Sequence, residues 1–369
     1  RAAAGVIPYN HRLTFVAHKL VLTLSIFKAR TRLFKSLCAA SALLAALLTT
    51  GCAGPSTQPE DAGAARFPRI VAHRGGTGDA PENTLEAIRL AIAHHADALW
   101  LTVQLSKDGV PVLYRPADLS ALTDASGPVN AFTAAQLAQI NAGWRFKTTD
   151  AAGRESWLYR TAPTHIPSLQ QALREIPPNL PVILDMKALP AEPQAQAVAR
   201  VLTEQNAWPR VTLYSTEAAY QQSFAAYPQA RMFESRDATR TRLLRVLLHD
   251  RAACTDSPAA HTWTAFELHR TLTVSEKFTL GEGRSQIDAT MWTPSTVACF
   301  RQQPDVRIVA IAVNTADDYR KAACLGIDAV LADSPKQMSA IRAAISAETQ
   351  AQTQTQRQAQ CAQPDRAQQ

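Results

Sequence analysis

Short apolar segments alternate with helical segments from about residue 69 to residue 347, and this alternation constrains the fold more than any other feature. The apolar segments are short, as in Val211–Tyr214, and the segments between them place apolar residues at helical spacing, as in Val198, Val201 and Leu202. About eight such repeats predict parallel strands joined by helices. We therefore predict an α/β fold, a (β/α)8 TIM barrel, with a doubly wound open sheet as the alternative.

The expected elements follow from these patterns. Strands are expected at 70–72, 98–105, 110–114, 181–184, 211–214, 231–233, 263–268, 307–313 and 329–331, and helices at 133–140, 168–175, 193–205, 217–226, 238–248, 316–324 and 336–347. The irregular stretch at about 115–165 is too long for a simple barrel loop, so it predicts an inserted subdomain after the second strand.

One motif places reactive side chains at the end of the first strand. The strand 70–72 delivers His73 and Arg74 to a glycine-rich turn, and Pro81–Thr84 then opens a helix that Asn83 or Thr84 can cap. Imidazole moves a proton near neutral pH, and guanidinium holds a phosphate through two parallel hydrogen bonds. The alternative is that both side chains are tied into the turn by Glu82 or Asp79.

The carboxyl ends of barrel strands carry the active site in this architecture. The residues expected there, besides His73 and Arg74, are Trp100, Thr102, Tyr114, Arg115, Asp185, Lys187, Tyr214, Ser215, Glu234, Asn314 and Asp333. Asp185 and Lys187 are two residues apart, so they share one face of a strand. They suit either an anion and metal site or a salt bridge to each other.

The pair of motifs His73-Arg-Gly and Pro81-Glu-Asn-Thr resembles the opening of the glycerophosphodiester phosphodiesterase family, whose fold is a (β/α)8 barrel. The resemblance extends to Asp333-Ser-Pro and covers about residues 68–345. It implies a phosphoric diester hydrolase of lipid metabolism that acts on a small-molecule phosphodiester. It also implies that His73 is the catalytic acid/base, that Arg74 contacts phosphate and that Glu82 belongs to the site.

The sequence departs from the family pattern at three positions. The family has Glu-x-Asp at the end of the second strand, where two carboxylates hold a divalent cation, and these positions are Trp100 and Thr102 here. The family's second catalytic His falls on Arg115. The later Glu-x-Lys is kept as Asp185 and Lys187, with a side chain one methylene shorter.

These departures predict an atypical, metal-poor site. Asp185 and Glu82 are the remaining candidate metal ligands and would hold Ca²⁺ or Mg²⁺ only weakly, so the site could also be metal-independent. Arg115 cannot be a general acid because its pKa is above about 12, but it could replace the cation as a fixed charge.

Arg74, Arg115 and Lys187 would then form a phosphate clamp, with Trp100 as an apolar wall or a surface on which substrate stacks. Two functions follow from this pattern. One is hydrolysis of glycerophosphodiesters, and the other is a catalytically inactive barrel that binds phosphorylated or anionic ligands.

The formal charge of +7 comes from the beginning of the chain, where seven basic residues and no acid precede Glu60. The rest is nearly neutral, so the charge predicts no nucleic-acid partner. A basic segment, an apolar run at 39–48 and the closing Leu48–Cys52 resemble a bacterial lipoprotein signal peptide, in which Cys52 is lipidated. An ordinary cleaved signal or an uncleaved anchor is the alternative.

We therefore expect a leader at 1–51, a tether at 52–67, the barrel at 68–345 and a disordered tail at 346–369. The membrane partner would be reached through the lipid anchor, with the protein in the bacterial cell envelope and facing the periplasm. In that oxidising compartment Cys254 and Cys299 could pair, although spacing cannot establish it. Cys324 is expected to pack as a small buried hydrophobe.

Overall fold

A computed structural model describes residues 67–249, 254–353, 355, 356, 359 and 361. The expected leader, the lipidation residue Cys52 and the tether up to residue 66 lie outside the described residues. All of the described residues belong to one compact unit, Gly63–Gln369.

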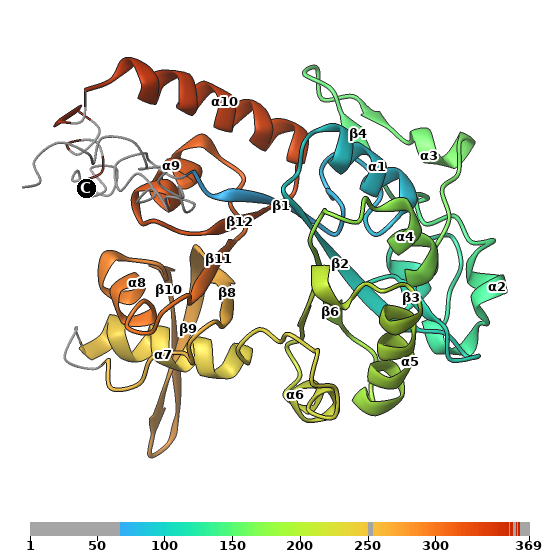
Figure 1. The fold of residues 1–369 in the computed structure, drawn as a ribbon, viewed down its shortest axis with the longest axis horizontal. Helices are drawn as coiled ribbons and strands as arrows, with labels where there is room; N and C mark the ends of the chain where they lie inside the picture. The colour runs from blue at the N-terminus through green and yellow to red at the C-terminus, as the bar shows by residue number, and fades with distance from the viewer. Residues whose placement is uncertain (1–66, 250–253, 354, 357–358, 360, 362–369) are drawn as a thin grey trace, which may run out of the picture. The chain divides into compact units, whose positions relative to one another are not determined.

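Seven strands form a continuous parallel sheet in the order β7-β6-β2-β1-β12-β11-β8 (Figure 1). They are β1 (Arg69–His73), β2 (Ala98–Leu105), β6 (Val182–Met186), β7 (Val211–Tyr214), β8 (Trp263–Glu267), β11 (Arg307–Ile311) and β12 (Ala329–Ala332). Nearly every residue of β2 and β6 is buried. Burial on both faces is what a parallel strand covered by helices requires.

The expected strand at 231–233 closes this sheet into a ring. Met232 makes a parallel bridge to Leu213 of β7, and Phe233 makes one to Trp263 of β8. The segment is too short to form a full strand, yet it occupies the eighth position between β7 and β8. The predicted (β/α)8 barrel is confirmed.

Helices follow the strands as the alternation predicts. They are α1 (Leu85–Ala93), α4 (Leu169–Glu175), α5 (Ala191–Glu204), α6 (Ala219–Phe224), α7 (Arg236–His249), α8 (Pro294–Phe300), α9 (Ala316–Cys324) and α10 (Pro335–Ala351), with a 3-10 turn η3 (Trp208–Arg210) before β7. Thr84 caps α1 by accepting a hydrogen bond from the backbone of Ala87. Serine or threonine caps α4, α8, α9 and α10 in the same way, and these caps determine which residues remain in the loops at the strand ends.

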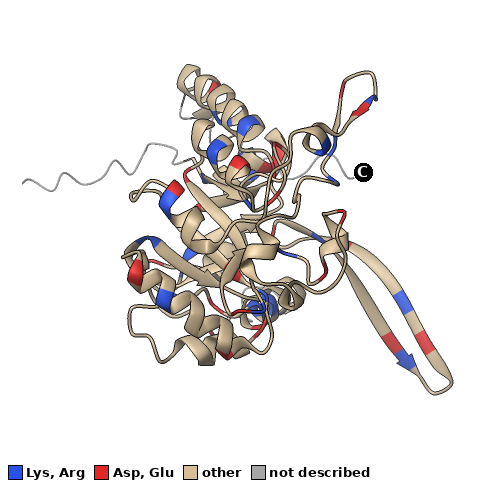
Figure 2. Cartoon of the chain, turned by 90° about the vertical axis from the view of Figure 1, so that its right-hand side faces the viewer, with Lys and Arg blue, Asp and Glu red and all other residues tan. Residues whose placement is uncertain are grey.

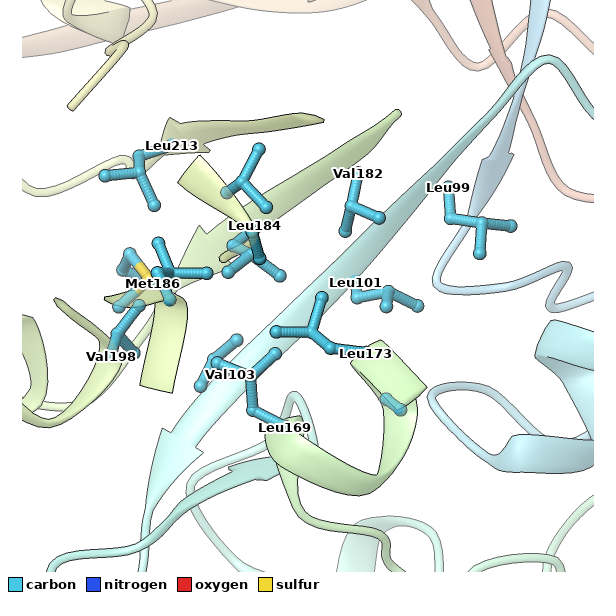
Figure 3. Close-up of a cluster of buried hydrophobic side chains, with 14 of the residues drawn as sticks. Leu99, Leu101, Val103, Leu169, Leu173, Val182, Leu184, Met186, Val198 and Leu213 are labelled. Atoms are coloured by element: carbon cyan, nitrogen blue, oxygen red, sulfur yellow. The ribbon is translucent and has the colours of Figure 1, made fainter. Parts of the chain in front are cut away.

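Alternate residues of each strand face opposite sides. On the outer side, the apolar side chains of β2, β6 and β7 pack against α4 and α5 (Figure 3). The labelled members are Leu99, Leu101, Val103, Val182, Leu184, Met186 and Leu213 from the strands, and Leu169, Leu173 and Val198 from the helices. This leaves the other face of the same strands for the interior of the ring.

The segment between β2 and α4 contains an antiparallel strand and several short elements. β3 (Pro111–Leu113) pairs with β2 and is followed by η1 (Leu119–Ala121), η2 (Val129–Ala131), α2 (Ala134–Leu137), β4 (Thr148–Thr149), β5 (Glu155–Ser156) and α3 (Leu158–Thr161). Its buried residues, which include Tyr114, Leu119 and Leu137, form a cluster separate from the barrel core.

A long hairpin between β8 and α8 was not predicted from the sequence. Its strands are β9 (His269–Phe278) and β10 (Gly281–Thr290), which pair antiparallel over ten residue positions. The hairpin extends away from the barrel (Figure 1 and Figure 2), and Leu280 at its turn is 99% exposed. Most of its side chains are polar and exposed on both faces, so it lacks the buried stripe by which a strand is recognised.

The described residues contain two disulfides. Cys254 pairs with Cys299, and Cys324 pairs with Cys361. The expectation for Cys324 was therefore wrong, because its side chain is exposed on α9 and bonded to the C-terminal segment. α10 also continues to Ala351, beyond residue 346, where the tail was expected to begin.

No helix of the described residues is both long and apolar enough to span a lipid bilayer.

Candidate active site

The interior of the ring ends at a polar layer. A buried cluster fills the ring with side chains from all eight strand positions: Val71, Ala98, Trp100, Ile183, Tyr214, Phe233, Ala265, Val309, Ala329 and Leu331. Two residues further along a strand the side chain faces the same side. His73, Thr102, Asp185, Glu267 and Asp333 therefore face the carboxyl end of the barrel, which we call the mouth.

The turn after His73 packs directly against the segment after β12. A side chain at Gly76, whose φ is +107°, would lie 2.9 Å from Pro335 Cδ, and the backbone N–H of Gly78 donates to Asp333 O at 2.8 Å. Only glycine fits a backbone approach this close at a positive φ. The two motifs at opposite ends of the barrel sequence therefore form one structure.

The side chain of His73 is hydrogen-bonded to that of Asp333. Its Nδ1 lies 2.6 Å from Asp333 Oδ1, and its side chain is 24% exposed. The hydrogen bond from His73 lowers the pKa of Asp333 to about 2, with further bonds from Asn314 and Thr77 acting in the same direction. The carboxylate is therefore ionised near neutral pH and accepts a hydrogen bond from Nδ1–H, while Nε2 has no partner among the described residues.

Arg74 is held by Glu82. Arg74 Nη1 lies 2.5 Å from Glu82 Oε2, and both side chains are mostly buried. Arg74 has a φ of +52°, which few residues other than glycine adopt, and its carbonyl accepts from the backbone of Asn83 at 2.7 Å. The alternative in which Glu82 ties Arg74 into the turn is therefore realised, although the same pairing also fixes the guanidinium at the mouth.

Asp185 and Lys187 form the second ion pair of the mouth, with 3.0 Å between Lys187 Nζ and Asp185 Oδ1. Burial raises the pKa of Asp185, while Lys187, Trp100 and Arg74 oppose this by favouring the ionised carboxylate. The salt bridge that the sequence left open is therefore present.

Trp100 fills the barrel interior just below the mouth. It is 3% exposed, and its ring lies 4.7 Å from that of Tyr214 and 5.7 Å from that of Phe233. It therefore forms an apolar floor beside Asp185, and direct stacking on a substrate stays a prediction.

Arg115 is the exposed cation of the predicted clamp. Its side chain makes no hydrogen bond or ion pair with another described residue, and its backbone carbonyl accepts from Gln104 Nε2 at 3.0 Å. Arg74 and Lys187 each face a carboxylate, whereas Arg115 keeps its charge free. Its contact with phosphate stays a prediction.

A further charged network lines the β7 and β8 side of the mouth and was missed in the sequence. Arg236 binds both oxygens of Glu267, at 2.7 and 2.8 Å, and donates to Tyr214 at 3.3 Å. Arg270 also donates to Glu267, at 2.7 Å. Arg236 is the first residue of α7 and lies in the polar run 234–237. The signal that could have found the network is Glu267, an acid at the end of an apolar strand.

The described residues of the mouth offer few oxygen ligands for a divalent cation. Glu82 and Asp185 each already face a fixed cation. Glu82 Oε1, Thr102 Oγ1 and Asp185 Oδ1 are buried without a hydrogen-bond partner in the described chain, so a cation bound here would take most of its roughly six to eight oxygen ligands from water or substrate. No group of three His, Cys, Asp or Glu side chains that could hold a metal occurs among the described residues.

A cavity of about 610 Å³ lies outside the ring, between α1, the 158–167 segment and α4. Its lining shares no residue with the ion pairs of the mouth. We therefore assign it no part in the chemistry.

Comparison with known proteins agrees with this geometry. The model of the glycerophosphoryl diester phosphodiesterase family matches residues 73–337. The uncharacterized protein Rv2277c of Mycobacterium tuberculosis is 48% identical over 268 residues, which are 73% of this chain and 87% of that protein.

Solved structures show the same fold. The crystal structure of the glycerophosphoryl diester phosphodiesterase domain of Rv2277c has a TM-score of 0.69 at 46% identity, covering 75% of this chain and 100% of that one. An Oleispira antarctica phosphodiesterase in complex with sn-glycerol-3-phosphate is similar in fold, with a TM-score of 0.53 at 22% identity over 74% of this chain and 96% of its own. The chain described here belongs to the glycerophosphoryl diester phosphodiesterase family.

Proposed function

We propose that this protein hydrolyses small glycerophosphodiesters with His73 as the acid/base and without a bound divalent cation. The observation that carries the proposal is the imidazole at the mouth of a family barrel, with Nδ1 bonded to Asp333 and Nε2 unpartnered among the described residues. Imidazole in this state accepts a proton at Nε2. The products would be an alcohol and glycerol phosphate.

In the proposed reaction Nε2 takes a proton from water as the water oxygen bonds to phosphorus. The bond from phosphorus to the leaving alcohol oxygen breaks, and Nε2 returns the proton to that oxygen. Arg74, fixed by Glu82, would bind the phosphate, and Lys187 and Arg115 would add positive charge in place of a metal. Fixed cations of this kind stabilise charge that develops on the phosphate oxygens.

A barrel that binds phosphorylated or anionic ligands without turnover is the second candidate. It is favoured by the residues at the positions where the family keeps metal ligands and a second histidine, namely Trp100, Thr102 and Arg115. This candidate retains Arg74 and Arg115 as anion contacts and gives His73 no proton to move.

The test is an assay of the purified full chain with glycerophosphocholine and bis-p-nitrophenyl phosphate, in Ca²⁺, in Mg²⁺ and in chelator. We expect equal turnover in all three conditions and a loss of about 10²- to 10⁴-fold in His73→Ala. His165→Ala, which changes an exposed histidine outside the mouth, is the matched control and should keep full activity. Turnover that needs added metal, or that survives His73→Ala, would contradict the proposal. Binding of these esters without turnover would support the second candidate.

We also propose that the protein is lipid-anchored through Cys52 and faces the periplasm. The two disulfides support a location outside the reducing cytoplasm. Metabolic labelling with palmitate in a bacterial host should mark the full chain and fail to mark Cys52→Ser. Labelling that persists in Cys52→Ser would exclude this residue as the lipid site.

A further inference from the structure

We propose that Asp333 is the positioning residue of the site, which holds the His73 imidazole with its proton on Nδ1 and its Nε2 directed to substrate. This inference rests on the proposed function. It assigns a role to the closing Asp333-Ser-Pro motif, whose first residue lies 260 positions after His73.

The first support is the chemistry of the contact. An ionised carboxylate only accepts hydrogen bonds, so the 2.6 Å contact requires the proton to be on His73 Nδ1. In the neutral ring Nε2 is then the acceptor, which is the state that a general base needs. A histidine whose second nitrogen is bonded in this way has both its tautomer and its ring orientation fixed.

The second support is that three further hydrogen bonds, with Thr77 and Asn314, fix the position of Asp333. Its Oδ1 accepts from Thr77 Oγ1 at 3.0 Å, and its Oδ2 accepts from Asn314 Nδ2 at 2.7 Å. Asn314 Oδ1 in turn accepts from the backbone N–H of Asp333 at 2.8 Å. Because a backbone N–H can only donate, this bond fixes which end of the Asn314 amide faces the carboxylate.

The third support is the rigidity of the backbone around Asp333. Its carbonyl accepts from Gly78, and the next residue, Ser334, caps α10 through Gln337. Ser334 also donates to Asp79 at 2.6 Å, which ties the start of α10 to the turn that follows His73. The carboxylate is therefore placed relative to the imidazole by elements on both sides of the contact.

A matched control exists at the other end of the same strand. Asp328 precedes β12, pairs with Arg301 at 2.8 Å and accepts from the backbone of Ile308. It resembles Asp333 in being an acid with charged and backbone partners, but it lies at the amino end of the barrel. Asp328→Asn therefore removes a comparable interaction without touching the site.

The experiment compares Asp333→Asn, Asp328→Asn and His73→Ala in the full chain, by proton NMR and by steady-state kinetics with glycerophosphocholine. A proton shared between Nδ1 and a carboxylate should give a strongly deshielded signal that is lost in His73→Ala and Asp333→Asn and kept in Asp328→Asn. An asparagine at 333 can donate to Nδ1 and so favour the opposite tautomer, and we expect kcat to fall about 10²- to 10⁴-fold with KM little changed.

The double variant separates positioning from structural support. In the His73→Ala background Asp333→Asn should cause no further loss of rate, because the group on which it acts is gone. A deshielded signal that survives Asp333→Asn, or an equal loss of rate in both backgrounds, would overturn the inference. Absence of turnover in the unchanged protein would contradict the proposed function, while the NMR comparison would still decide the role of Asp333.

Discussion

Among the ion pairs at the mouth of this barrel, the pair of Asp185 and Lys187 and the pair of His73 and Asp333 differ in which groups they leave free. Asp185 and Lys187 are both largely buried, and their charged atoms lie 3.0 Å apart. In the His73 and Asp333 pair the carboxylate side chain is 44% exposed, and the imidazole keeps one nitrogen without a partner in the described chain. The first pair holds a fixed charge distribution, and the second is arranged to exchange a proton.

The two pairs lie on different sides of the mouth. On the β2 and β6 side, Trp100 and Lys187 surround Asp185 with an apolar ring and a cation. On the β1 and β12 side, Asp333 accepts a hydrogen bond from His73. The two sides are connected, because β1 pairs with β2 and Asn83 Oδ1 accepts from the backbone N–H of Thr102 at 2.8 Å.

The largest expected effect on stability comes from breaking the buried pair. Lys187→Met leaves Asp185 as an unpaired buried charge, and we expect the free energy of unfolding to fall by about 3–5 kcal/mol in urea titration. Lys147→Met breaks an exposed pair with Glu155 and should change it by less than about 1 kcal/mol. Equal losses of unfolding free energy in the two variants would mean that burial does not determine how much each ion pair contributes to stability.

A smaller effect is expected from the apolar floor. Trp100→Phe removes ring volume from the packed interior and a group that favours the ionised Asp185, so we expect a loss of about 1–2 kcal/mol. Trp157→Phe, on the partly exposed edge of the inserted segment, should cost less than about 0.5 kcal/mol. Thermal unfolding followed by circular dichroism measures both, and a neutral Trp100→Phe would show that the indole is not part of the barrel packing.

The smallest expected effect on stability comes from acid titration of Asp333 in its pair with His73. The pKa of Asp333 is lowered from 3.8 to about 2, so its contribution to stability is complete above about pH 4 and is lost as the pH falls towards 2. The shift alone would correspond to about 2 kcal/mol, and because the side chain is nearly half exposed we expect about 1 kcal/mol. Urea midpoints measured between pH 5 and pH 2 should show this loss, and Asp333→Asn should lack it.

The fold could be predicted because its strands are buried on both faces and its helices on one, so both periods are visible in the sequence. β9 and β10 could not, because their threonines and charged residues face solvent on both sides. The seventeen-residue α10 was predicted too short, since the alanines and polar residues that end it resemble a tail.

For the site, the sequence indicated the partners that are near in the chain, Glu82 for Arg74 and Lys187 for Asp185, but not the distant ones. His73, Arg74, Asp185 and Lys187 were placed at strand ends by pattern and by resemblance. That His73 contacts Asp333, and Arg236 contacts Glu267, depends on which strand ends become neighbours when the ring closes. Contacts between residues so far apart in the chain have no local signature.

The ring closes through a short seam. Between β7 and β8 it is joined by the bridges of Met232 and Phe233, whereas β2 and β6 are registered over five residue pairs. The barrel should open locally first where the strand pairing is shortest. Amide protons of residues 231–234 should therefore exchange with deuterium earlier than those of β1, β2 and β6. Because Arg236 and Tyr214 lie beside that join, local opening there would widen the mouth on the side opposite His73.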